Sequence, residues 1–140
     1  MNSILVVKMK NNDYPSALIG YELLTENISR FSFNFKKRLY IDILYNLAYL
    51  YELDGKLESS KATSYKAIEV SKEIGDLSNL FNLYYLLGTI EYQLGNTSLA
   101  FKCFDYYITL ASITLEDREK VTYYIKTIER LYNYKRPRTH

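Results

Sequence analysis

Two carboxylate pairs are the side chains best suited to acid–base chemistry. Glu69 and Glu73 are four residues apart, a spacing that places them on one face of a helix, and Glu116 is followed directly by Asp117. Both pairs have Lys or Arg neighbours in exposed helical patterns, so we interpret them as surface charge. The sequence contains neither a glycine-rich phosphate loop nor a Gly-x-Ser-x-Gly nucleophile motif. We therefore expect no enzymatic activity.

Thiol and imidazole chemistry has equally little support. Cys103 is the only cysteine, and His140, the only histidine, is the last residue. These two residues cannot provide a disulfide framework, a multi-cysteine zinc site or a multi-histidine metal centre. We therefore expect no metal and no cofactor. Cys103 precedes Phe104 on a predicted helix, and we expect it to be an inert core residue.

The overall composition narrows the class of partner. The chain has 140 residues, with 18 Lys and Arg against 16 Asp and Glu, so the formal net charge is only +2. This charge favours neither direct nucleic-acid binding nor a membrane surface. The apolar run from Ile4 to Val7 is too short for a transmembrane helix or a signal-peptide core. We expect a cytoplasmic protein without a membrane partner.

The side chains described above must be positioned by long helices. The sequence has only two Pro and five Gly, but 16 Tyr. Apolar residues recur every three or four positions, which is the spacing of one helix face. Helices are expected over residues 13–30, up to 55, over 58–74, between 76 and 95, over 99–110 and over 121–131, with a loop over 31–38.

An internal repeat with a period of forty residues organises these helices. Each copy has a glycine where its first helix ends, because glycine can take the left-handed conformation that closes a helix. Each copy also has small residues where two paired helices must cross closely. The aligned residues are Leu44, Leu47, Ala48, Gly55, Ser60, Ser64 and Ala67 in the first copy and Tyr84, Leu87, Gly88, Gly95, Ala100, Phe104 and Tyr107 in the second.

The repeat resembles a tetratricopeptide (TPR) array, whose pattern is Trp-x2-Leu-Gly-x2-Tyr, then Ala-x3-Phe, then Pro, with a period of about 34. Here the Trp and the closing Pro are absent, Glu91 stands where the second Tyr is expected, and the longer period implies longer helices. The residues that fit are Leu44, Leu47, Ala48 and Tyr51 in the first copy and Tyr84, Leu87, Gly88, Ala100 and Phe104 in the second.

The run Lys-Ala-Ile-Glu-Val-Ser-Lys-Glu-Ile-Gly-Asp over residues 66–76 is similar to extended TPR arrays. Such arrays occur in the Rap, Rgg and PlcR-type bacterial receptors for signalling peptides. The resemblance implies an all-α fold of TPR-like helical-hairpin repeats, an α-solenoid of about three helix pairs and a C-terminal helix. We expect this repeat domain over residues 1–133 and a basic C-terminal tail over 134–140.

The resemblance also implies where a partner would bind. In TPR arrays the first helix of each pair lines a concave groove. In this sequence those positions combine Tyr with Asn and Thr, and the last helix adds Tyr123. Carboxamides bond to a peptide backbone and Tyr adds contact area, so we expect a peptide or protein segment in the groove. The predicted contact residues are Tyr45, Asn46, Tyr49, Asn82, Tyr85, Thr89 and Tyr92.

Two functions remain open at this point. One is the sensor part of a bacterial peptide-responsive transcriptional regulator, in which case the chain is a fragment with a DNA-binding domain upstream. The other is a structural adaptor or oligomerisation module without a small ligand. In a homodimer, a second copy would cover the incomplete first repeat near Ile4 to Val7. A receptor leaves Asn46, Asn82 and Tyr85 accessible, whereas a scaffold buries them.

Overall fold

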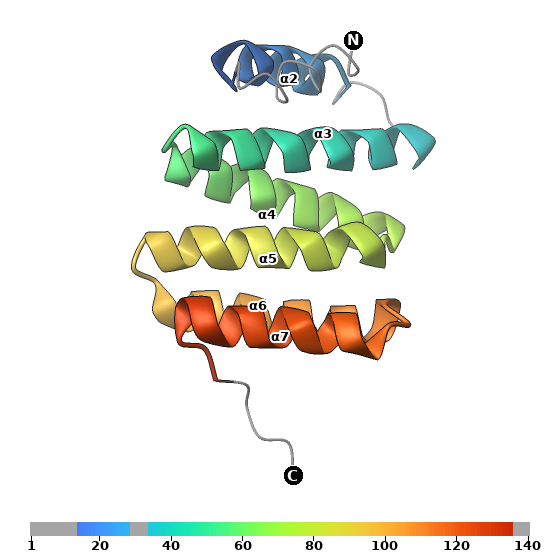
Figure 1. Cartoon of the computed structure of the whole chain (residues 1–140). Coiled ribbons are helices and arrows are strands. Elements are labelled where there is room, and N and C mark those ends of the chain that lie inside the picture. Colours follow the sequence, from blue (N-terminus) through green and yellow to red (C-terminus); the bar gives the residue numbers. More distant parts are fainter. Residues whose placement is uncertain (1–13, 29–33, 136–140) are drawn as a thin grey trace. The chain divides into compact units, whose positions relative to one another are not determined.

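The computed structural model describes residues 14–28 and 34–135, which form six α-helices and no strand (Figure 1). The all-α class of TPR-like helical hairpins is thereby confirmed. No helix in these ranges has the length and apolar character needed to cross a bilayer. The helices are α2 (Tyr14–Ile28), α3 (Asn34–Leu53), α4 (Leu57–Ile74), α5 (Leu77–Gln93), α6 (Thr97–Thr114) and α7 (Arg118–Tyr132).

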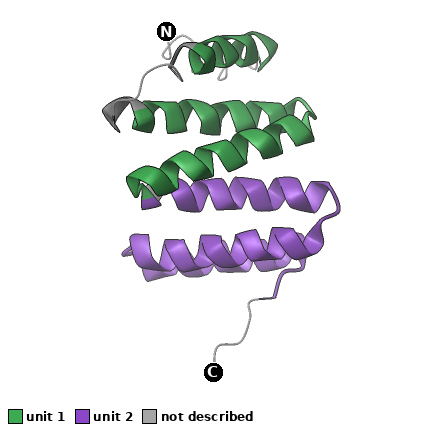
Figure 2. Ribbon diagram, turned by 180° about the vertical axis from the view of Figure 1, so that it is seen from behind, with its two compact units in different colours: residues 1–76 green, residues 77–140 purple. Residues whose placement is uncertain are grey.

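The chain divides into two compact units (Figure 2). Unit 1 spans Met1–Asp76 and contains α2, α3 and α4, whereas unit 2 spans Leu77–His140 and contains α5, α6 and α7. In unit 1, α3 packs against both α2 and α4, and in unit 2, α6 packs against both α5 and α7. Each unit is therefore one helical hairpin with one additional helix.

The two hairpins repeat one turn geometry at the predicted spacing of forty residues. Gly55 and Gly95 have φ values of 77° and 85°, a left-handed conformation that side chains with a Cβ rarely adopt. In the first turn, the amide of Gly55 donates to the Glu52 carbonyl at 3.1 Å and that of Lys56 to the Tyr51 carbonyl at 2.8 Å. The corresponding bonds of the second turn measure 3.0 and 2.8 Å. The repeat thus holds for the backbone and not only for the residue types.

Small residues bring α3 and α4 together in unit 1. Ala48 and Ser60 are fully buried, and the Ser60 hydroxyl donates to the Ala48 carbonyl oxygen at 2.5 Å. Ser64, one turn further along α4, is fully buried as well. This contact confirms the close helix crossing that the small residues predict.

Unit 2 fills the equivalent crossing differently, with no side chain at one position and a large ring at the other. Gly88 takes the place of Ala48, and Phe104 takes the place of Ser64. The Phe104 ring is fully buried, and a Cβ added to Gly88 would lie only 2.5 Å from its Cε1 atom. A side chain at residue 88 would therefore force the Phe104 ring to shift, because the ring occupies the space that the side chain would need.

The structure differs from the sequence expectations at both ends of the repeats. Helix α3 begins at Asn34, so residues 34–38 are helical and not part of a loop. Lys37 Nζ lies 3.4 Å from Glu73 Oε2, which ties the start of α3 to the end of α4. Tyr134, which we expect in the tail, is only 2% exposed. Residues 1–13, which include the apolar run of the incomplete first repeat, residues 29–33 of the expected first helix and loop, and residues 136–140 of the tail lie outside the described residues.

Candidate functional site

Three of the predicted contact residues lie on α3 in unit 1. Asn46 is half-buried, and its Nδ2 donates to the Tyr21 hydroxyl of α2 at 3.3 Å. Tyr21 is fully buried, and this burial raises its pKa, an effect that the bond from Asn46 partly offsets. Asn46 therefore holds α2 against α3. Tyr45 is half-buried and Tyr49 is 39% exposed, so Tyr49 is the most accessible of the three.

A second polar contact also joins α2 to α3. The hydroxyl of Tyr51 donates to Glu22 Oε2 at 2.8 Å. Burial first, and then the hydrogen bond and the negative charge of Glu22, raise the pKa of Tyr51 to about 12. Tyr51 occupies the position of a Tyr in the TPR pattern, whereas the two aligned copies of the repeat do not include Glu22.

The other four predicted residues lie on α5 in unit 2. Thr89 is buried, and its hydroxyl donates to the carbonyl oxygen of Leu86 in the same helix at 2.7 Å. Tyr92 packs edge-on against Tyr132 of α7, with ring centroids 5.0 Å apart. These two residues contribute to helix packing. The remaining two, Asn82 and Tyr85, lie at a pocket.

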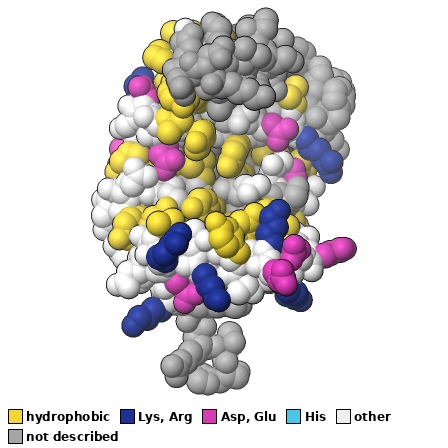
Figure 3. All heavy atoms as spheres, viewed as in Figure 1, with side chains coloured by type: hydrophobic (Ala, Val, Ile, Leu, Met, Phe, Trp, Pro, Cys, Tyr) yellow, Lys and Arg dark blue, Asp and Glu magenta, His cyan; other side chains and the backbone are white. Residues whose placement is uncertain are grey.

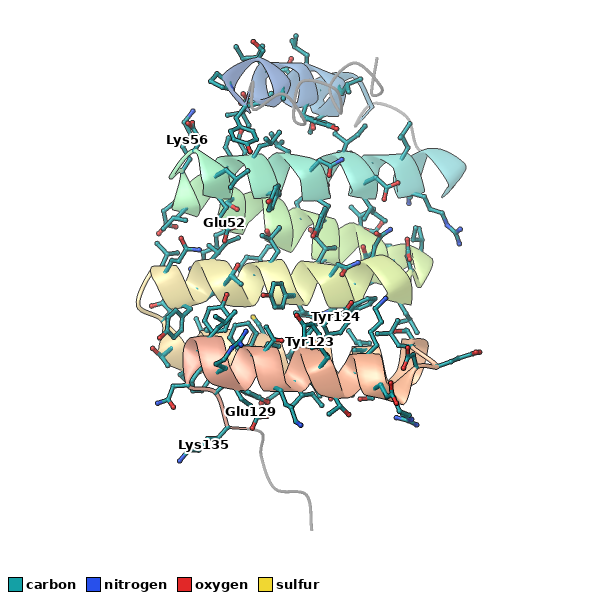
Figure 4. All side chains as sticks on the ribbon, in the orientation of Figure 1. Glu52, Lys56, Tyr123, Tyr124, Glu129 and Lys135 are labelled. Carbon is teal, nitrogen blue, oxygen red and sulfur yellow. The ribbon has the colours of Figure 1, made fainter. Side chains whose placement is uncertain are left out.

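The pocket has a volume of about 340 Å³ and lies between α5, α6 and α7. The nearly buried ring of Tyr107 from α6 forms its floor, and Asn82 and Tyr85 line one side. Tyr123 and Tyr124 of α7 line the opposite side and extend toward α5 in Figure 4. The remaining lining residues are Phe81, Leu115, Lys120 and Thr127.

The rim of this pocket is polar and positively charged. Lys120 Nζ lies 5.9 Å from the centroid of the Tyr124 ring, within the range of a cation–π contact. Asp117 does not line the pocket; it caps α7, where its Oδ1 accepts from the amides of Glu119 and Lys120 at 3.0 and 3.2 Å. Among the described residues, no carboxylate lines the pocket. In Figure 3, hydrophobic side chains gather over α5 and α7 with Lys and Arg side chains beside them.

This pocket is predicted from the sequence only in part. Asn82, Tyr85 and Tyr123 are among the predicted groove positions, whereas Lys120 and Tyr124 are not. A usable signal was present, because Lys120, Tyr123, Tyr124 and Thr127 follow the 0, 3, 4, 7 spacing of one helix face.

A buried acid lies elsewhere in unit 2. Glu91 is fully buried, and its Oε1 accepts from Asn96 Nδ2 at 3.3 Å. Burial, and to a lesser degree the negative charge of Glu91, raises the pKa of Cys103 to about 12. A thiol with so high a pKa is a poor nucleophile near neutral pH. Cys103 is thus a buried core residue, as the sequence predicts.

Comparison with known proteins bears on the repeat type. A tetratricopeptide repeat is found over residues 41–74, which include most of α3 and all of α4. No curated protein and no solved structure gives a significant match to the chain. The α5–α6 hairpin lies outside the match but repeats the α3–α4 turn forty residues later. Residues 41–74 are therefore a repeat of the tetratricopeptide type, a kind of helical hairpin that mediates protein interactions.

Proposed function

We propose that this chain is a cytoplasmic, non-catalytic module that binds a peptide or an extended segment of a partner protein. The observation that carries the proposal is the aromatic pocket with a polar rim at Asn82 and Tyr85, two positions that the repeat pattern selects for ligand contact. Tyr rings provide contact area at a low entropic cost, and the carboxamide can both donate to and accept from a peptide backbone. The tetratricopeptide repeat of residues 41–74 supports the same class of partner.

Selection from a displayed peptide library against the full chain tests this proposal. Selected peptides are then titrated against the wild type, Asn82→Ala, Tyr49→Ala and the control Lys102→Ala, which alters an exposed residue of α6. Loss of a contact that matters for binding should weaken affinity about tenfold in Asn82→Ala or Tyr49→Ala, with no change in the control. Far-UV circular dichroism verifies folding. Failure to select any peptide, or equal affinity across all four proteins, contradicts the proposal.

A narrower form of the proposal is the sensor part of a bacterial peptide-responsive transcriptional regulator. Its support is the similarity of residues 66–76 to the arrays of such receptors. A receptor for signalling peptides should bind a short free peptide at least as tightly as the same sequence within a folded carrier protein. Clear preference for the folded carrier would contradict the receptor form and leave general protein binding intact.

One observation favours a second candidate function, an adaptor or oligomerisation module. Leu99, Tyr106 and Ile113 are all exposed on α6 and are spaced by seven residues, which keeps them on one helix face. A second copy of the chain could cover this apolar row as a homodimer. Light scattering over a concentration series measures the solution mass. A solution mass above that of the monomer supports this candidate if the Tyr106→Glu variant has a lower mass. A monomeric mass at all concentrations contradicts it.

A further inference from the structure

We propose that the pocket of unit 2 holds an aromatic side chain of the bound segment, and that Lys120 contacts an acidic side chain next to it in the partner's sequence. This inference rests on the proposed function and specifies its ligand. The support comes from the arrangement of the rings, the size of the pocket and the charge of its rim.

The rings that form the pocket are arranged to receive another ring. The floor, Tyr107, contacts Phe81, Tyr85 and Tyr124 at centroid distances of 5.8, 5.1 and 6.1 Å, with interplanar angles of 33°, 53° and 52°. These separations lie within the range of about 4.5–7 Å over which aromatic pairs attract each other. An aromatic side chain entering the pocket can extend the same pattern, whereas an aliphatic side chain gains only burial.

The size of the pocket fits a single anchor. Its volume of about 340 Å³ is at the lower end of the range of about 300–1,000 Å³ that is typical of ligand sites. Such a space accommodates one large side chain with part of its backbone. The exposed ring of Tyr123, at 63%, stands at the rim, where it can pack against the edge of an inserted ring.

The positive charge of the rim favours an acidic residue next to the aromatic side chain that enters the pocket. The four Tyr rings of the lining could also form an aromatic cage for a cation such as methyl-lysine. Lys120 disfavours that ligand, because its ammonium lies over the Tyr124 ring and no described carboxylate of the pocket offsets its charge. The Lys120 ammonium and the Asn82 carboxamide both donate hydrogen bonds. Their chemistry favours a carboxylate beside the anchor.

The test uses the absence of Trp from the chain. Because the protein contributes no Trp emission, the fluorescence of a Trp peptide reports only on the peptide. The probes are the capped peptides acetyl-Gly-Gly-Trp-Glu-Gly-Gly-amide, its Trp-Gln and Trp-Lys analogues, and a fluorophore-labelled Leu-Glu analogue followed by anisotropy. We expect a saturable blue shift with the Trp-Glu peptide. Its affinity should exceed that of the Trp-Gln peptide by about two- to fivefold, the effect of one exposed ion pair.

Two variants locate the binding. Tyr123→Ala should weaken the Trp-Glu peptide about tenfold, as loss of an aromatic contact does, and the exposure of this ring favours retention of the fold. Lys120→Gln should bring the affinities for the Trp-Glu and Trp-Gln peptides together. The matched controls are Lys126→Gln and Leu131→Ala on the same helix, both exposed and outside the pocket lining. Neither control should change the affinities.

The outcomes separate this inference from the proposed function. Equal affinity for Trp-Glu and Trp-Gln, or tighter binding of Trp-Lys, overturns the acidic neighbour, and tighter binding of Leu-Glu overturns the aromatic anchor. Library-selected peptides that depend on Tyr49 and not on Tyr123 overturn the inference but keep the proposed function. If no library peptide binds at all, the proposed function itself is overturned.

Discussion

The hydroxyl of Tyr134 donates a hydrogen bond to the carboxylate of Asp105, which joins the residue two positions after α7 to the middle of α6. Asn133 makes this connection possible, because it adopts φ of 53° and so turns the chain back toward α6. Asn is one of the few residues that tolerate this left-handed conformation. The Tyr134 ring then packs edge-on against Phe101 and Phe104, at centroid distances of 5.3 and 5.9 Å.

Tyr134→Ala should destabilise the chain by about 3 kcal/mol, because it removes a buried aromatic ring from the core of unit 2. Tyr134→Phe keeps the ring and loses only the bond to Asp105, at a cost of about 1 kcal/mol. Urea unfolding followed by circular dichroism measures both. Tyr106→Phe, at an exposed ring, should stay within about 0.5 kcal/mol of the wild type. An unchanged midpoint for Tyr134→Ala would show that this residue is not part of the folded core.

Gly88→Ala should lower the free energy of unfolding by about 1–3 kcal/mol, because the added methyl group overlaps the Phe104 ring. This result runs against helix propensity, which favours Ala over Gly by about 1 kcal/mol. A double-mutant cycle provides the control. In the Phe104→Leu background, where the ring is gone, Gly88→Ala should cost less than in the wild type. Equal costs in both backgrounds would mean that the two residues are not in contact.

Asn46→Ala should destabilise unit 1 by about 1 kcal/mol, because it deprives the buried Tyr21 hydroxyl of the bond from Asn46. Removing the hydroxyl as well should recover part of this loss, so Asn46→Ala with Tyr21→Phe should be less destabilised than the sum of the single variants. The urea midpoint is again the measurement. Strict additivity of the two changes would argue against the bond.

The raised pKa of Cys103 predicts that the stability of the fold depends on pH. Its pKa is 9.0 in the unfolded reference and about 12 in the fold, so the folded state favours the protonated thiol. Between these two values the native state binds more protons than the unfolded state, so the contribution is fully present below pH 9.0 and is lost as the pH rises toward 12. The wild type should therefore lose stability more steeply than Cys103→Ala across this interval, as measured by urea unfolding. Parallel decline of both proteins would contradict the shift.

The repeat and its turns could be predicted because their signals are local. Few residues other than glycine readily adopt the left-handed conformation that the turns need at residues 55 and 95. The spacing of apolar residues defines each helix face. The start of α3 was not predictable in the same way. It coincides with the ion pair between Lys37 and Glu73, two residues 36 positions apart, and no local pattern encodes such a contact.

The candidate site was likewise predictable from the sequence only in part. Asn82 and Tyr85 were predicted because their place in the repeat selects the exposed face of a first helix. The engagement of Asn46 with Tyr21 was not, because the sequence alone does not indicate which face of α3 is covered by α2. Tyr134 was assigned to the tail because the basic residues after it dominate the local composition.

The different filling of the two helix crossings determines which helices can pair with each other. Repeats that share one backbone are prone to exchange equivalent helices while they fold. Pairing α3 with α6 would force the Cβ of Ala48 into the space of the Phe104 ring, whereas pairing α5 with α4 would leave a void between Gly88 and Ser64. Mispaired hairpins are therefore penalised by overlap in one case and by an unfilled volume in the other. The divergence of these four side chains encodes the correct partner for each helix within an otherwise repeated fold.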